Sequence, residues 1–285
     1  TAVFTISSGV VAFVNESGEL KELLKKADFS LSMGKRSGKN NLYLFNSIEY
    51  TKHINKLYLR EKLRDSVKEN FKGFEMYYQP VVDASKLSSC SNKVDGVKVI
   101  GAEALLRWSC PEFGLLGADQ IVPILEESGL IAPVGRWILI KTFTQCKMWN
   151  EYNKRFHMSV NLSYMQFERS DIVLDVQMAL EKSGVNPENV ILEITESGYI
   201  DHVELQKILD EFHAMKIRVD IDDFGTGYSN LTNVVTLPFS TVKMDRSLVL
   251  MMEKNSRSCR LIKNLVSTFK DSNFSVLVEG VETEN

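Results

Sequence analysis

The spacing of hydrophobic and polar residues changes character near Phe74. From there on, short apolar runs alternate with stretches in which apolar residues recur at helical intervals, as between Glu204 and Met215. Apolar strands that alternate with amphipathic helices are typical of a parallel sheet covered on both faces or closed into a barrel. We therefore predict an α/β fold for this part. The expected strands read EMYYQPVVD, KVIGAEALLRW, HMSVNLS, NVILEIT, RVDIDDF, STVKMD and FSVLVEG.

The segment before Phe74 has its own pattern. TAVFTISSGVVAF predicts a strand, and after a helix and the basic loop GKRSGKN a second strand follows, NLYLF. This segment begins directly on a strand and is too short for a core of its own. A polar helix from about Ser47 to Asn70 resembles a rigid connector. The first helix should bury Leu20, Leu23, Leu24, Ala27 and Leu31, and the connector should bury Ile54, Leu57, Leu63 and Val67.

The most informative stretch is Arg218–Tyr228, RVDIDDFGTGY, a strand that runs into two adjacent carboxylates. In a continuing strand Asp222 and Asp223 would point apart. We expect Phe224 and the two glycines after it to break the strand, so that both carboxylates turn toward one point. Two such charges repel and are rarely tolerated without a cation between them. The alternative interpretation of this stretch alone is a solvated strand end before a hairpin turn.

Polar residues recur where the apolar strands end, and each is separated from the next by about one βα unit. Barrel enzymes place their active sites at this end of the strands. All of them except Lys243 carry oxygen ligands. With Glu103 and Asp223 they form an all-oxygen set that suits Mg²⁺ or Mn²⁺ better than zinc. So many carboxylates favour two ions about 4 Å apart, the arrangement used for in-line attack at phosphorus. The strand-end residues are Asn161, Glu193, Asp222, Lys243 and Glu279.

Two cationic residues belong to the same region. Lys243 either balances the acids as a salt bridge or holds the attacking hydroxide or the developing oxyanion. Arg107 has the planar fork that a phosphodiester requires, and a structural ion pair is its alternative role.

Composition excludes several classes of protein. A net charge of -3 and a pI near 5.9 disfavour a nucleic-acid duplex as partner. The four cysteines form no C-x-x-C pair, which indicates reduced cytosolic thiols rather than a disulfide or zinc framework. We expect no membrane contact within this chain, because no apolar run approaches the roughly 18 residues that span a bilayer. Neither a phosphate loop nor a G-x-S-x-G nucleophile is present.

The runs YYQPVVD, GAEALLRW, VNLS, LEITES, DDFGTGYSNL, VKMD and VEGVE resemble, in order and spacing, the EAL-domain cyclic di-GMP phosphodiesterases of bacterial signalling. The run TISSGVVAF and the basic loop resemble the C-terminal part of a GGDEF domain. The resemblance implies a (β/α)8-like TIM barrel (EAL domain) with a partial α+β GGDEF-like segment at the N-terminus. It also implies two Mg²⁺ or Mn²⁺ ions and hydrolysis of cyclic di-GMP to linear pGpG.

The family's functional positions carry over to matching residues here. The resemblance implies a catalytic role for Lys243, Glu279 and Glu196, of which Glu196 would brace the loop that follows Asp223. Substrate would contact Gln79, Leu106, Arg107 and Asp223. The implied metal ligands are Glu103, Asn161, Glu193, Asp222, Asp223 and Glu279.

The resemblance also sets the expected domain boundaries. Residues 1–48 correspond to the end of a GGDEF-like domain without its cyclase signature loop, 49–72 to a linker helix and 73–285 to an EAL domain lacking its last strand. Residues 85–97 are a polar insertion. The family implies a homodimer through the barrel and a cytoplasmic location. The rival hypothesis is a receptor that binds cyclic di-GMP without hydrolysing it and signals to a partner protein.

Overall fold

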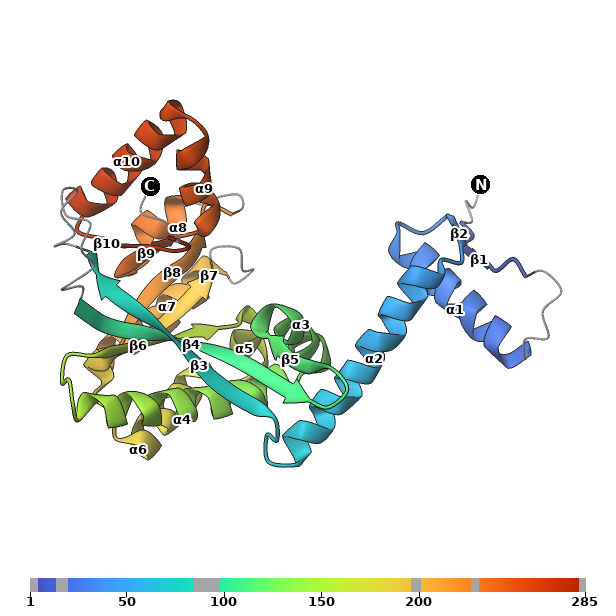
Figure 1. The fold of residues 1–285 in the computed structure, drawn as a ribbon, viewed down its shortest axis with the longest axis horizontal. Coiled ribbons are helices and arrows are strands. Elements are labelled where there is room, and N and C mark those ends of the chain that lie inside the picture. Colours follow the sequence, from blue (N-terminus) through green and yellow to red (C-terminus); the bar gives the residue numbers. More distant parts are fainter. Residues whose placement is uncertain (1–4, 14–19, 85–97, 196–200, 227–230, 282–285) are drawn as a thin grey trace. The chain divides into compact units, whose positions relative to one another are not determined.

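The computed structural model describes residues 5–13, 20–84, 98–195, 201–226 and 231–281 (Figure 1). The chain divides into two compact units, residues 1–65 and 66–285. The expected insertion at residues 85–97 lies outside the described part. No helix within the described ranges is both long and apolar enough to cross a membrane.

The first unit is built on a strand–helix–strand element. Strand β1 (Ser8–Val10) pairs in parallel with β2 (Leu42–Leu44), and α1 (Leu20–Arg36) connects them. A Cβ atom at Gly9 would lie 2.2 Å from the backbone nitrogen of Leu31, so α1 crosses β1 in direct backbone contact there. Within its described residues the first strand is much shorter than the apolar run suggested.

The buried face of α1 differs from the expected one. Leu20 and Leu24 are 72% and 55% exposed, whereas Phe29 is buried against the rings of Tyr50 and His53. These two residues belong to α2 (Ser47–Lys68). The prediction for Leu20 and Leu24 was therefore wrong, because the aromatic contacts with α2 lie along the C-terminal half of α1. In α2 itself, Leu63 is buried as expected, with Leu59, but Ile54 is 43% exposed.

The second unit contains an eight-stranded sheet in the order β10-β9-β8-β7-β6-β4-β3, with β5 paired to β4. The strands from β4 to β10 along this order are parallel, while β3 and β5 run antiparallel to β4. The bounds are β3 (Phe74–Asp83), β4 (Lys98–Cys110), β5 (Gly114–Gly117), β6 (His157–Leu162), β7 (Val190–Thr195), β8 (Arg218–Phe224), β9 (Thr241–Met244) and β10 (Ser275–Val278).

Two features of this sheet differ from the predicted alternation. β3 and β4 form an antiparallel pair from Phe74 opposite Trp108 to Asp83 opposite Lys98, with a shift of register between Val81 and Val82. A parallel pair would need a crossover connection, usually a helix, and the sequence between them has no helical periodicity. β5 was not predicted because its four residues carry no alternation. Among the described strands the sheet is open, with β3 and β10 as its two ends, which is consistent with part of a barrel.

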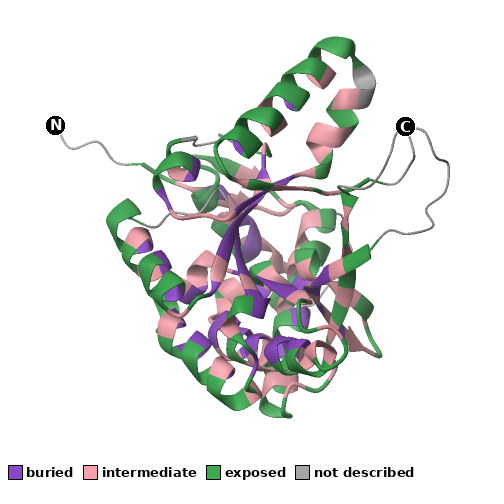
Figure 2. Cartoon of the chain, turned by 90° about the vertical axis from the view of Figure 1, so that its left-hand side faces the viewer, coloured by how far each residue is buried: buried purple, intermediate pink, exposed green. Residues whose placement is uncertain are grey.

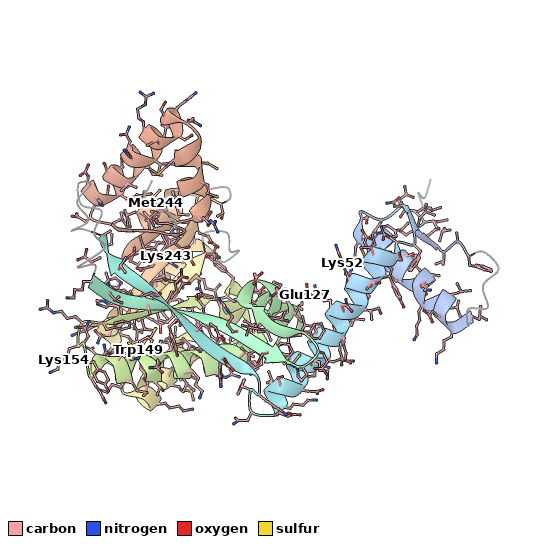
Figure 3. All side chains as sticks on the ribbon, in the orientation of Figure 1. Lys52, Glu127, Trp149, Lys154, Lys243 and Met244 are labelled. Carbon is pink, nitrogen blue, oxygen red and sulfur yellow. The ribbon has the colours of Figure 1, made fainter. Side chains whose placement is uncertain are left out.

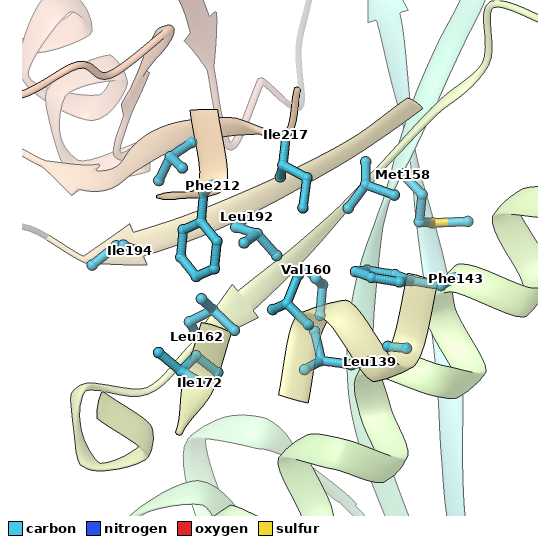
Figure 4. Packing of buried hydrophobic residues seen from close by; sticks show 14 of the residues in the cluster. Leu139, Phe143, Met158, Val160, Leu162, Ile172, Leu192, Ile194, Phe212 and Ile217 are labelled. Carbon is cyan, nitrogen blue, oxygen red and sulfur yellow. The ribbon is translucent and has the colours of Figure 1, made fainter. Parts of the chain in front are cut away.

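Helices cover one face of this sheet. The largest hydrophobic core lies between the central strands and α4, α6 and α7, where Phe143, Met158 and Phe212 have no exposed surface (Figures 2 and 4). The helices are α3 (Ala118–Ser128), α4 (Ile131–Asn150), α5 (Tyr164–Arg169), α6 (Ile172–Ser183), α7 (His202–Ala214), α8 (Leu231–Thr236), α9 (Arg246–Lys254) and α10 (Ser256–Asp271), with a 3-10 turn at Pro187–Asn189.

Short polar side chains fix where strands pass into helices. After β6, Ser163 accepts a hydrogen bond from the backbone nitrogen of Met165, and after β9, Asp245 accepts one from Ser247. Such caps satisfy backbone donors that the first helical turn leaves free. They end each strand at a defined residue and thereby fix which side chains stand at the carboxyl edge of the sheet.

Candidate active site

The face of the sheet opposite the core carries polar residues. On β8, Val219 and Ile221 are buried among apolar residues, so strand alternation places Asp220 and Asp222 on the other face. The predicted strand-end residues of the neighbouring strands meet Asp222 at the carboxyl edge. They are Asn161 on β6, Glu193 on β7, Lys243 on β9 and Glu279 just after β10, and Glu103 joins them from the middle of β4.

Lys243, which is labelled in Figure 3, is the centre of this cluster. Its Nζ lies 2.8 Å from Glu279, 2.9 Å from Glu193, 3.1 Å from Asp222 and 3.2 Å from Glu103. Its side chain is 1% exposed. Burial by itself would lower the pKa of this ammonium group, but the four carboxylates outweigh burial and hold the pKa above its ordinary value. Lys243 is therefore charged and neutralises part of the acidic cluster.

Three carboxylates of the cluster, those of Glu193, Asp223 and Glu279, have raised pKa values. Burial raises the pKa of Glu193 to about 8, and the neighbouring Glu103 and Asp222 add to this, against the opposite effect of Lys243. Burial likewise raises the pKa of Asp223 and of Glu279. A divalent cation among these groups would favour their ionised forms.

A β-bulge directs two adjacent carboxylates to the same side. Ile221 pairs with Val242 and Phe224 with Met244, so that Asp222 and Asp223 together stand opposite the single residue Lys243. Asp223 adopts a left-handed backbone with φ of 55°, and its nitrogen donates to Asp222 Oδ1 at 2.8 Å. Strand β8 ends at Phe224, before Gly225, as predicted, but the two carboxylates turn to one side because of the bulge inside the strand rather than because of the break after it.

The oxygen atoms form two overlapping groups. Carboxylate oxygens of Glu103, Glu193 and Asp222 lie within 4.8 Å of one another, and so do those of Asp222, Asp223 and Glu279. Asp222 belongs to both. Asn161 adjoins the first group, because its Nδ2 donates to Glu103 Oε1 at 2.7 Å. An all-oxygen donor set in two groups that share a carboxylate fits a pair of hard divalent ions.

Three of the four expected substrate-binding residues lie on β3 and β4, and the fourth, Asp223, stands in the bulge of β8. Gln79 is exposed and pairs directly with Glu103 across the two strands. The Arg107 guanidinium lies 5.6 Å from the ring centroid of Tyr77 and donates to the carbonyl oxygen of Leu106 at 2.8 Å. Leu106 itself is 5% exposed, and strand alternation places it on the face opposite Glu103. The structure therefore does not bring Leu106 together with the acidic cluster.

Two sequence-based expectations fall outside the described residues. Glu196 lies in the segment 196–200, and the loop after Gly225 includes residues 227–230. The role assigned to Glu196 remains a prediction.

Sequence reasoning gave no role to Asp220, which is 3% exposed on the same strand face as Asp222. Burial raises its pKa to about 6, and a hydrogen bond with Thr241 opposes this shift. The signal was present, because the alternation that selected Asp222 also selects Asp220.

Comparison with known proteins gives one consistent result. Residues 60–285 match the family model described as the EAL domain. The chain is 31% identical over 280 residues to the bifunctional diguanylate cyclase/cyclic di-GMP phosphodiesterase MucR of Pseudomonas aeruginosa, covering 98% of this chain and 39% of that protein. It is 28% identical over 283 residues to the cyclic di-GMP phosphodiesterase PdeR of Escherichia coli, covering 99% and 41%. The chain thus spans about two fifths of the length of these relatives.

Solved structures agree with this match. The phosphodiesterase PaMucR in complex with c-di-GMP is 33% identical, with a TM-score of 0.70, covering 80% of this chain and 88% of that one. The EAL enzyme Bd1971 with cAMP and cyclic-di-GMP bound is 26% identical, with a TM-score of 0.72, covering 94% and 68%.

Proposed function

Because the chain belongs to the EAL-domain family, we propose that it hydrolyses cyclic di-GMP to linear pGpG with two Mg²⁺ or Mn²⁺ ions. The observation that carries this proposal is the pair of overlapping carboxylate groups that share Asp222. By name, the relatives MucR and PdeR are cyclic di-GMP phosphodiesterases, and the solved structure of PaMucR is a complex with c-di-GMP.

The acidic cluster would hold the ions, one near Glu103 and Glu193 and the other near Asp223 and Glu279. Bound ions would lower the pKa of water and offset the negative charge that develops at phosphorus. The protein supplies fixed positions for this chemistry, because the ligands stand on strand ends and in a strand bulge rather than on long loops.

Lys243 and the residues of β3 and β4 would act on the substrate. A charged Lys243 Nζ in the middle of the cluster can hold the attacking oxygen and stabilise charge on a phosphoryl oxygen. Arg107 has the bidentate geometry for a phosphodiester, and Gln79 stands beside Glu103. We keep Leu106 as a substrate contact and Glu196 as the brace of the loop after Asp223 only as expectations from the family.

The test is incubation of metal-free protein with cyclic di-GMP and separation of the products by chromatography. We expect pGpG with Mg²⁺ or Mn²⁺, no turnover after chelation, and inhibition by Ca²⁺, which prefers longer and looser oxygen coordination. Turnover that survives complete chelation would contradict the metal mechanism. Saturable binding of cyclic di-GMP without pGpG under all three conditions would instead indicate a receptor.

Two further proposals concern the rest of the chain. The parallel β1–α1–β2 element is compatible with the C-terminal part of a GGDEF-like domain. Since no cyclase signature loop occurs in this sequence, we expect no synthesis of cyclic di-GMP from GTP. We also propose a homodimer of the second unit, supported by exposed apolar side chains on α8 and α9, namely Val235, Leu250 and Met251. Light scattering of the purified chain tests this state.

A further inference from the structure

A cavity of about 430 Å³ lies at the edge of the sheet opposite the acidic cluster. Its walls come from the segments that lead into β6, β7 and β8. Strand β8 links the two places, because Arg218 lines the cavity at its first residue and Asp222 stands near its end. Four residues of strand separate them by roughly 13 Å, at about 3.3 Å per residue. The cavity is therefore distinct from the proposed metal site.

The lining of this cavity is strongly basic. Lys154, Arg155, His157, Lys216 and Arg218 contribute to it, against one acid, Glu188. Glu188 is already engaged, since its Oε1 lies 3.3 Å from Lys216 Nζ. This concentration of positive charge occurs in a chain whose net charge is -3, so it does not reflect the general composition. Clustered cations attract anions.

Arg218 gives a second and independent indication. Its Nη2 atom is shielded from solvent and has no hydrogen-bond partner within the described part of the chain. Asp220, the nearest acid on this strand face, attracts Arg218 electrostatically but directs its hydrogen bond to Thr241. A buried guanidinium nitrogen without a partner costs free energy, which an oxyanion in the cavity would recover. The neighbouring His157 has a lowered pKa because of burial and the charge of Arg218.

Local hydrogen bonds hold the walls in place. Asn189 Nδ2 donates to the carbonyl oxygen of Lys154 at 3.1 Å and so ties the turn before β6 to the start of β7. Asn186 Oδ1 accepts from the backbone nitrogen of Glu188 at 3.2 Å. Lys216, with a left-handed φ of 64°, forms the tight turn that leads into β8. The basic side chains thus extend from a defined backbone frame.

From this geometry we propose that the cavity is a second ligand site, which binds the phosphate group of a small molecule. The volume lies within the usual range of small-molecule sites, about 300–1,000 Å³. The lining side chains include no phenylalanine, tyrosine or tryptophan that would stack on a base, so the phosphate group itself provides the recognition. Arg218 forms the inner contact, and Lys154 and Arg155 form the outer one.

The test is calorimetric titration of pyrophosphate into the whole chain after chelation and dialysis, so that no metal ion at the acidic cluster can retain the probe. We expect saturable binding of one equivalent. Arg218→Gln and the double variant Lys154→Gln/Arg155→Gln should each weaken it at least tenfold. The matched control, Arg260→Gln/Lys263→Gln, removes the same charges from the exposed face of α10 and should bind like the wild type.

Parallel titrations with guanosine triphosphate and cyclic di-GMP identify the source of the phosphate group. Tighter binding of either nucleotide than of pyrophosphate assigns the site to that nucleotide when Arg218→Gln or Lys154→Gln/Arg155→Gln removes the difference. Equal binding, or tighter binding that these variants leave unchanged, assigns the cavity to inorganic oxyanions. Absence of saturable binding up to about 10 mM of every probe overturns the proposal. So does equal weakening in the α10 control, which would indicate a general charge effect. If Arg218→Gln fails to fold, the double variant Lys154→Gln/Arg155→Gln still tests the proposal, because both residues are exposed.

Discussion

At the scale of single residues, Lys243 is the cation of a site rich in carboxylates. Replacing it by glutamine would leave the carboxylates of the cluster close together without the cation that offsets their mutual repulsion. We expect Lys243→Gln to lower the unfolding free energy of the metal-free protein by about 3–5 kcal/mol, as for other broken buried pairs. Mn²⁺ should restore most of this loss, while turnover falls at least a hundredfold with little change in substrate affinity.

Urea denaturation with and without Mn²⁺, together with steady-state kinetics, measures both effects. Asp222→Asn is the matched control, because it removes an acid from the same cluster and should abolish turnover without destabilising the metal-free fold. If Lys243→Gln retains wild-type turnover, Lys243 only balances charge.

The raised pKa of Glu193 makes stability depend on pH. The folded protein binds this proton up to about pH 8, whereas the unfolded chain releases it near pH 4.5. Between these values the folded state binds more protons, so the unfolding free energy of the metal-free protein falls as pH rises. We expect Glu193→Gln to reduce this slope. Burial shifts Asp223 and Glu279 in the same direction, so part of the slope remains.

Urea midpoints measured from pH 4 to pH 9 in the presence of a chelator check this prediction. Identical slopes for the wild type and Glu193→Gln would show that Glu193 is ionised throughout the range.

At the scale of elements, the position of Gly101 fixes the distance between β4 and β6. A Cβ atom there would lie 2.7 Å from the carbonyl oxygen of His157, which belongs to the neighbouring strand. Gly101→Ala must therefore separate the strands that carry Glu103 and Asn161. We expect a loss of about 1–3 kcal/mol of stability and at least tenfold lower turnover. Denaturation and kinetic assays measure the two losses.

Gly184→Ala provides the matched control. Gly184 ends α6 with φ of 63° and has open space around its missing Cβ, so alanine adds only backbone strain of about 1–2 kcal/mol. Its turnover should equal that of the wild type. Equal losses of turnover in both variants would show that Gly101 affects the site only through global stability.

The elements also show how far sequence reasoning extends. The strands from β6 to β10 were predicted within about two residues, because apolar runs flanked by caps have few alternative structures. The bulge in β8 was not predicted, since it depends on pairing with Lys243 of another strand. The antiparallel direction of the β3–β4 pair and the four-residue strand β5 were not predicted for similar reasons. Periodicity indicates that a strand exists but not which neighbour it pairs with or in which direction.

The same distinction applies to the candidate site. Residues at strand ends, such as Glu193 and Lys243, could be selected because alternation and end position are local properties of the sequence. That one ammonium group contacts four acids depends on the curvature of the whole sheet, which no short window of sequence contains.

At the scale of the whole molecule, every described residue of the proposed active site belongs to the second unit. We therefore expect a truncated chain of residues 47–285, which retains all of α2, to hydrolyse cyclic di-GMP within about threefold of the full rate. Initial rates at matched concentrations of folded protein test this. A truncated chain that folds, binds Mn²⁺ and yet has lost turnover would assign the first 46 residues a part in catalysis.

The charge of the acidic cluster also has a kinetic consequence. Glu103, Glu193, Asp222, Asp223 and Glu279 surround a single lysine, so the metal-free site repels an anionic diester. Under the proposed two-ion mechanism, productive encounter then requires divalent ions to arrive first. Under this compulsory order, raising the nucleotide concentration cannot compensate for scarcity of metal, and the free concentration of the ion determines how much enzyme is competent at any moment.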